Sequence, residues 1–123
     1  MANKQNLEKI YEAINKAIDV ATVKADDALK SGKISESEWQ TAKDKWGKLE
    51  IKQSEINGII IDKEFHKKLL NNNLESRISQ IEQATNSLNK SAGKIDDFNN
   101  FLSEIENALQ IVSGTIKAIS PIV

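Results

Sequence analysis

The last quarter of the chain carries the pattern that most constrains its fold. From residue 95 to residue 123, apolar side chains recur at alternating steps of three and four residues: Ile95, Phe98, Leu102, Ile105, Leu109, Val112, Ile116, Ile119 and Val123. This spacing places all of them on one face of an α-helix, which Phe101, Ala108 and Ile122 widen. The pattern predicts a helix over about 95–120 whose apolar face must be covered by packing.

A helix of the same kind is expected over about 4–30. Its apolar residues also alternate between steps of four and three: Leu7, Tyr11, Ile14, Ile18, Ala21, Ala25 and Ala28. Ser31-Gly32 is expected to end this helix, because glycine can adopt the left-handed backbone conformation that closes a helix C-terminus.

The stretch GKISESEW, residues 32–39, predicts the start of the next helix. Ser35 suits the N-cap, and Glu38 is placed to bond back to the Ser35 amide, which together make a capping box. Ile34 and Trp39 occupy the two positions of a hydrophobic staple. The stretch resembles the glycine–isoleucine–acidic–aromatic turn of short helix-turn-helix oligomerisation motifs in bacterial proteins. Capping alone accounts for it, and no family follows from these eight residues.

The helix that begins there is expected over about 35–57. Its apolar seam has a single polar member, Gln53: Trp39, Ala42, Trp46, Leu49, Gln53, Ile56 and Ile60. The position of both tryptophans on this seam favours a core role, whereas exposed tryptophans would be binding hot spots for a partner. Asn57-Gly58 is the expected stop, with a kink in a longer helix as the alternative.

A further helix is expected over about 62–90, interrupted by the poor helix formers Asn71–Asn73. Its apolar phase persists across them: Phe65, Leu69, Leu70, Leu74, Ile78, Ile81, Thr85 and Leu88. The four segments predict an all-α fold, a single domain over 1–123 built as an elongated antiparallel bundle of about four helices. The two halves would form two helical hairpins with coiled-coil-like seams.

Composition and motifs give no support to catalysis or to nucleic-acid binding. Seventeen basic and 18 acidic side chains nearly cancel, whereas nucleic-acid binders usually carry a basic excess. The chain has no cysteine, its one histidine is His66, and its glycines form no phosphate-binding loop. We therefore expect no enzymatic activity, no cofactor and no metal site.

These features predict a helical protein–protein interaction or assembly module: an adaptor, an inhibitor or an oligomeric subunit. Its partner would be another protein or a second copy in a dimer or higher oligomer, as in small proteins of bacterial or phage type. The candidate interaction-face residues are Trp39, Trp46, Phe98, Phe101, Leu102, Ile105, Leu109, Val112, Ile116 and Ile119. Charges interrupt the N-terminal residues at short intervals, so a cytoplasmic protein without a signal peptide is expected.

A membrane-active protein, pore-forming or holin-like, is the alternative. It would use the amphipathic segment 95–123, within which residues 105–123 carry only Glu106 and Lys117 as charges. That length is close to what a bilayer span needs, and a membrane-peripheral location would follow. Polar residues nevertheless interleave with the apolar ones: Asn107, Gln110, Ser113, Thr115 and Ser120. This interleaving favours a helix packed on other helices.

Overall fold

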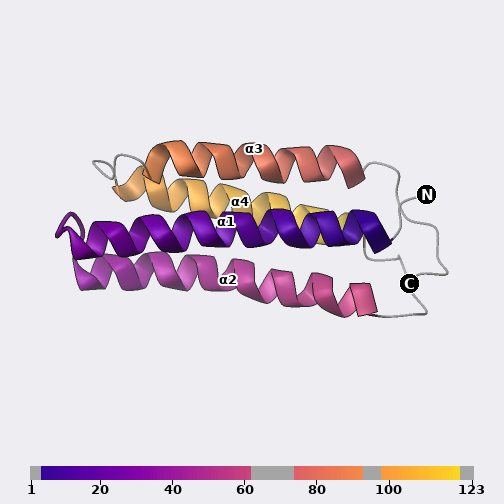
Figure 1. The fold of residues 1–123 in the computed structure, drawn as a ribbon, viewed down its shortest axis with the longest axis horizontal. Coiled ribbons are helices and arrows are strands. Elements are labelled where there is room, and N and C mark those ends of the chain that lie inside the picture. Colours follow the sequence, from indigo (N-terminus) through magenta and orange to yellow (C-terminus); the bar gives the residue numbers. More distant parts are fainter. Residues whose placement is uncertain (1–3, 62–73, 93–97, 120–123) are drawn as a thin grey trace.

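Four helices form an elongated bundle (Figure 1). The computed structural model describes residues 4–61, 74–92 and 98–119. The helices are α1 (Lys4–Lys30), α2 (Glu36–Ile61), α3 (Leu74–Ala92) and α4 (Phe98–Ile119), and the described residues contain no strand. The all-α bundle expected from the sequence is confirmed.

The bundle consists of two antiparallel hairpins, α1–α2 and α3–α4, laid side by side. Helix α1 packs against α2 and α3, and α4 packs against α3 and α2, while α1 and α4 lie diagonally opposite and barely touch. In Figure 1, α1 and α3 run in the same direction, as do α2 and α4. Each helix therefore has one antiparallel neighbour within its hairpin and one parallel neighbour in the other hairpin.

The turn between α1 and α2 is built as the sequence predicts. Gly32 has a φ of +76°, in the left-handed region. The amide of Lys33 donates to the carbonyl of Ala28 (2.9 Å), and that of Gly32 donates to the carbonyl of Leu29 (3.1 Å). This pair of bonds is the Schellman motif, which satisfies carbonyls that the end of a helix leaves free.

The capping box that starts α2 is also present. The Glu38 amide donates to Ser35 Oγ (3.1 Å), and the Ser35 amide donates to Glu38 Oε1 (2.9 Å). Ile34 is buried and packs with Ala28, with the partly buried Trp39 against them. The hydrophobic staple thus covers the end of the first hairpin.

The expected end of α2 near residue 57 is wrong, because the helix continues through Gly58 to Ile61. Glycine weakens a helix by only about 1 kcal/mol, and on either side of it Ile56, Ile59 and Ile60 are held by packing against the core. The expected starts of the third and fourth helices, near 62 and 95, lie outside the described residues. So do His66, the Asn71–Asn73 run, Ile95 and Val123.

One hydrophobic core receives side chains from all four helices. In α1 the buried residues extend beyond the predicted face to Ile10, Ala13 and Ala17, because this helix packs on two neighbours. Alanines are frequent along α1, and their small side chains allow neighbouring helices to approach closely. The seam predicted in α2 is confirmed by the burial of Ala42, Trp46, Leu49 and Ile56.

Helix α4 is rotated about its axis relative to the predicted seam. Its most deeply buried residues are spaced by four, three, four and three residues: Phe101, Ile105, Ala108, Val112 and Thr115. Leu102 and Leu109, which the spacing placed on the seam, are only half-buried. Thr115, predicted to belong to the polar residues of the helix, is fully buried, and its hydroxyl donates to the Ile111 carbonyl at 2.8 Å. That bond satisfies the hydroxyl within its own helix.

Candidate interaction surface

Half of the residues predicted to form an interaction face lie inside the bundle. Each of these five is at most 9% exposed: Trp46, Phe101, Ile105, Val112 and Ile116. Trp46 of α2 and the other four residues, all on α4, belong to the same hydrophobic core. In this arrangement they have no surface to present to another molecule, so their role is to hold the four helices together.

Four other predicted residues lie at the edge of the core. Trp39, Phe98, Leu102 and Leu109 are half-buried and pack against the buried residues. Phe98 also contacts Phe101, with ring centroids 6.2 Å apart. The side chain of the tenth predicted residue, Ile119, lies outside the described part of the chain.

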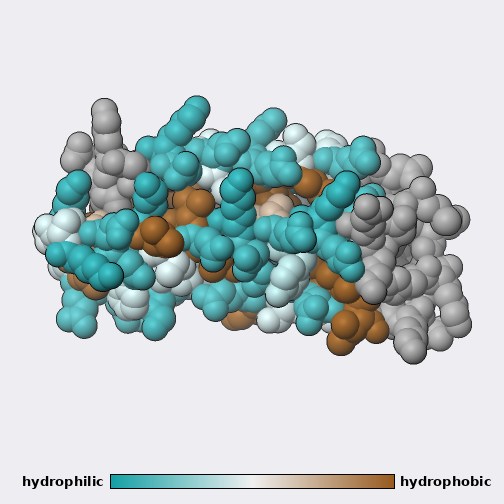
Figure 2. Space-filling model, viewed as in Figure 1, coloured by the Kyte–Doolittle hydropathy of each residue, from teal (hydrophilic) through white to brown (hydrophobic). Residues whose placement is uncertain are grey.

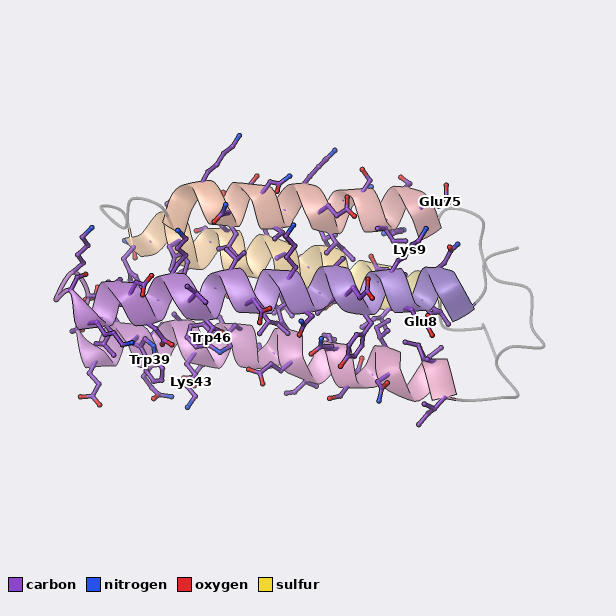
Figure 3. All side chains as sticks on the ribbon, in the orientation of Figure 1. Glu8, Lys9, Trp39, Lys43, Trp46 and Glu75 are labelled. Atoms are coloured by element: carbon purple, nitrogen blue, oxygen red, sulfur yellow. The ribbon has the colours of Figure 1, made fainter. Side chains whose placement is uncertain are left out.

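The two tryptophans form a corner between α1 and α2, next to the first turn (Figure 3). Their rings meet edge to face, with centroids 5.9 Å apart and an interplanar angle of 80°. The indole N–H of Trp39 donates to Asp26 Oδ1 of α1 at 2.8 Å, and Lys43 Nζ lies 5.2 Å from the centroid of the Trp39 ring. The ring and the N–H of Trp39 are thus both engaged within the chain, which indicates a structural role.

A second line, of small residues and two isoleucines, runs along the side of α2 that faces away from the core. Ile51 is 60% exposed and Ile61 is 71% exposed, and they are two of the three most exposed large apolar side chains among the described residues. The third, Val23, lies on α1. We call this line the outer face of α2. Its members are spaced by four, three, four and three residues: Gly47, Ile51, Ser54, Gly58 and Ile61.

Among the described residues, no packing contact accounts for the two glycines of the outer face. A Cβ atom added to Gly47 or to Gly58 would meet no atom of the described ranges within 4 Å. Each glycine weakens the middle of a helix by about 1 kcal/mol relative to alanine. By contrast, Gly32 is required by its positive φ.

Charged residues flank the outer face on both sides. Lys48 and Glu55 lie on one side of it, and Lys43 and Glu50 lie on the other, and all four are exposed. Glu55 also contacts Lys52 one turn earlier, with a nitrogen-to-oxygen distance of 3.6 Å. Figure 2 shows a brown apolar cluster toward the right of the lower edge of the molecule, and smaller brown spots elsewhere on that edge among teal and white side chains.

Helices α2 and α4 are joined at the surface by an ion pair between Lys45 and Glu106. The hydrogen bond from the Lys45 ammonium, together with its charge, lowers the pKa of Glu106 below its ordinary value. Lys48 adds a weaker effect of the same sign. Both partners remain partly exposed, so solvent screens the interaction.

A groove of about 620 Å³ lies between the parallel helices α1 and α3. Its floor includes Ala13, Ile78 and Thr85, all buried. On α3 its wall carries Glu75 and Glu82, seven residues apart. On α1 its wall carries Lys9 and Lys16, also seven residues apart, with Glu12 between them. Figure 3 shows Lys9 and Glu75 at the same end of the bundle. The two lysines of α1 and the two glutamates of α3 thus face a common groove, with Glu12 as a like charge beside them.

The outer face of α2 was missed from the sequence because the inward seam of the same helix is stronger. The signal was nevertheless present, since the positions from Gly47 to Ile61 have the same alternating spacing as the inward seam. The helix therefore carries Ile51 and Ile61 on the side opposite its buried seam.

No protein-family model matches the chain, and no curated protein or solved structure is detectably similar to it. Within the described ranges, none of the helices combines the length and the apolar character that crossing a bilayer requires. The same ranges contain no cluster of three or more histidine, cysteine or acidic side chains suited to a metal ion.

Proposed function

We propose that this protein is a non-enzymatic assembly module that binds another polypeptide through the outer face of α2. The observation that carries the proposal is the exposure of Ile51 and Ile61 along one line of a helix whose opposite side is already buried. Removing apolar surface from water is favourable by about 25 cal/mol per Å². A partner helix laid along this line would bury Ile51 at its centre and cover Ile61 at its end, and Gly47 and Gly58 would let it approach closely.

The membrane-active alternative has less support. It would need the apolar face of α4, which in the bundle is buried against α3 and α2. Withdrawing α4 would uncover Phe101, Ile105 and Val112 on one side and their core neighbours on the other. Uncovering large apolar core residues costs about 1.5–3 kcal/mol each. A membrane would have to return all of that free energy before any net insertion.

Site-specific photo-crosslinking tests the proposal in cells of the source organism. A photoreactive phenylalanine analogue replaces Ile51 in one variant and Val23 in the other, because these residues have similar exposure, 60% and 54%. We expect a covalent adduct with a polypeptide from position 51 and none from position 23. If position 51 yields no adduct, or yields the same adducts as position 23, the outer face of α2 is not a binding surface.

A further inference from the structure

We infer that the outer face of α2 binds the same face of a second copy of this chain, with the two helices antiparallel. The inference rests on the proposed function and names the partner of the surface described above. Its support comes from the charges that flank the apolar line.

The spacing of the outer face fixes which residues would meet in such a pair. An isologous two-fold axis near residues 52 and 53 places Ile51 opposite Ser54 of the second copy, and Gly47 opposite its Gly58. The same axis sets Ile61 opposite Asp44, so Ile61 lies at the edge of the contact and is covered only in part. Ile51 then projects toward small residues on the opposing helix. Because Cβ atoms are absent at Gly47 and Gly58, the two helix backbones can approach closely there.

The flanking charges complement one another in the antiparallel arrangement. Lys48 and Glu55 lie on the same side of the outer face, one heptad apart. Antiparallel pairing brings Lys48 of each copy beside Glu55 of the other, which gives two ion pairs of opposite charge. On the other side, Glu50 meets the neutral Asn57 of the second copy.

The same charges oppose a parallel pair. In a parallel coiled coil, a residue at position g of one helix contacts the residue at position e of the next heptad on the partner helix, which lies five positions further along the sequence. With Ile51 at position a, Lys43 and Glu50 occupy g and Lys48 and Glu55 occupy e. Lys43 would then face Lys48 of the second copy, and Glu50 would face Glu55, each contact occurring twice. The parallel pair thus has four repulsive contacts, whereas the antiparallel pair has two attractive ones, so the charges favour the antiparallel orientation.

The contact between the two copies would be short. From Gly47 to Gly58 the helix advances about 17 Å at 1.5 Å per residue. Such a contact falls below the roughly 1,200 Å² that marks stable protein complexes, so a dissociation constant on the order of 10–100 μM is expected. The dimer would form at high local concentration, as in an assembly held by additional contacts.

Sedimentation equilibrium of the purified full chain, from low micromolar to several hundred micromolar, tests the inference. We expect a monomer–dimer equilibrium in the wild type and in Val23→Glu, the control of similar exposure on α1. Ile51→Glu should weaken dimerisation about tenfold or more, because it places two charges in the centre of the contact. A monomer at every concentration, or equal weakening by both variants, overturns the inference.

Charge reversal tests the orientation. Lys48→Glu and Glu55→Lys should each weaken dimerisation about two- to fivefold at low salt, and the double variant should return close to wild type. No recovery in the double variant overturns the antiparallel pairing. Circular dichroism of each variant checks the fold, because Lys48 also lies near Glu106.

The two proposals fail in different ways. A photo-crosslinked adduct from position 51 that contains a different protein, combined with a purified chain that stays monomeric, overturns self-pairing and supports the proposed function. The absence of any adduct from position 51 in cells overturns the proposed function itself. An adduct of twice the mass of the chain supports both.

Discussion

At the scale of single residues, a few hydrogen bonds around Gly32 and Ser35 fix where α1 ends and α2 begins. The Schellman motif and the capping box lie only a few residues apart, so the chain reverses direction within a short turn. The buried Ile34 then fastens that turn to the end of the core. The direction of α2 along α1 therefore depends on local chemistry as well as on the apolar seam.

Ser35→Ala should lower the free energy of unfolding by about 1 kcal/mol, because the amide of Glu38 loses the Oγ acceptor at the helix start. Urea denaturation followed by circular dichroism measures the change. Ser37→Ala is the matched control, since Ser37 is an exposed serine two residues further along the same helix. Similar losses in both variants would show that the cap does not stabilise α2.

The lowered pKa of Glu106 predicts a pH-dependent contribution to stability. A carboxyl group with a lower pKa in the folded state stabilises the fold above its ordinary pKa. That contribution is lost as the pH falls through the lowered value. Glu106→Gln should therefore slightly reduce the melting temperature at neutral pH, and the difference from wild type should close in acid.

Lys45 provides the control for this pH dependence, because its hydrogen bond and charge are the main causes of the lowered pKa. In a Lys45→Met background, Glu106→Gln should leave the melting temperature nearly unchanged at every pH. High salt should also shrink the difference, since both partners are partly exposed. A difference that persists in the Lys45→Met background would assign the effect to another group.

At the scale of the helices, spacing predicts that a face is buried but not how far it rotates. In α4 the centre of the buried face moves from Leu102 and Leu109 toward Phe101 and Ala108. The cause is that α4 packs on two neighbours at once, and the line between them sets its rotation. Thr115 could not be assigned from its polarity, because a threonine inside a helix can satisfy its hydroxyl with its own backbone.

The ends of helices were predicted where local chemistry defines them and missed where tertiary packing does. Gly32 adopts the left-handed conformation and ends α1, while Gly58 stays within α2. Each glycine is followed two residues later by an isoleucine, Ile34 or Ile60. The local sequence alone therefore did not show which of the two glycines ends a helix. Similarly, the outer face of α2 was not predicted, because the seam on the opposite side already accounted for the apolar spacing of that helix.

The two kinds of glycine should respond oppositely to alanine. Gly47→Ala should raise the free energy of unfolding by about 0.5–1 kcal/mol, because the position is helical and the added Cβ meets nothing within 4 Å. Gly32→Ala should lower it by about 1–2 kcal/mol, because the φ of +76° strains a residue with a Cβ. Chemical denaturation of both variants at low micromolar concentration, where self-association is negligible, measures the two changes. Changes of the same sign would contradict the assigned backbone conformations.

At the scale of the whole molecule, the arrangement of the hairpins is the part that the sequence did not determine. An apolar seam predicts that one face of a helix is buried. It does not predict which helix covers that face, because isoleucine, leucine and alanine side chains can pack against many different apolar surfaces. The bundle places α1 beside α3 and leaves α1 diagonal to α4. The α1–α3 groove is lined by Lys9 and Lys16 on one helix and by Glu75 and Glu82 at equal spacing on the other, and Glu12 of α1 offsets part of this complementarity.

The absence of cysteine makes this arrangement open to a direct test, since introduced pairs are the only thiols. Lys16→Cys with Glu82→Cys should crosslink efficiently with a short bifunctional maleimide, because both residues line the α1–α3 groove. Lys16→Cys with Asn107→Cys, exposed on the diagonal helix α4, should not. The reverse result would show a bundle in which α1 and α4 are neighbours, as in a ring of four antiparallel helices.

The direction of α3 along α1 is tested by a second pair of variants. Lys9, Glu75 and Asn86 all line the groove, but Glu75 lies near the start of α3 and Asn86 near its end. In parallel helices Lys9→Cys should crosslink with Glu75→Cys and fail with Asn86→Cys, and antiparallel helices would invert this preference. Mass spectrometry of the intact chain distinguishes the crosslinked product from singly modified protein. Because both pairs share Lys9→Cys, a difference between them reports helix direction and not the reactivity of that position.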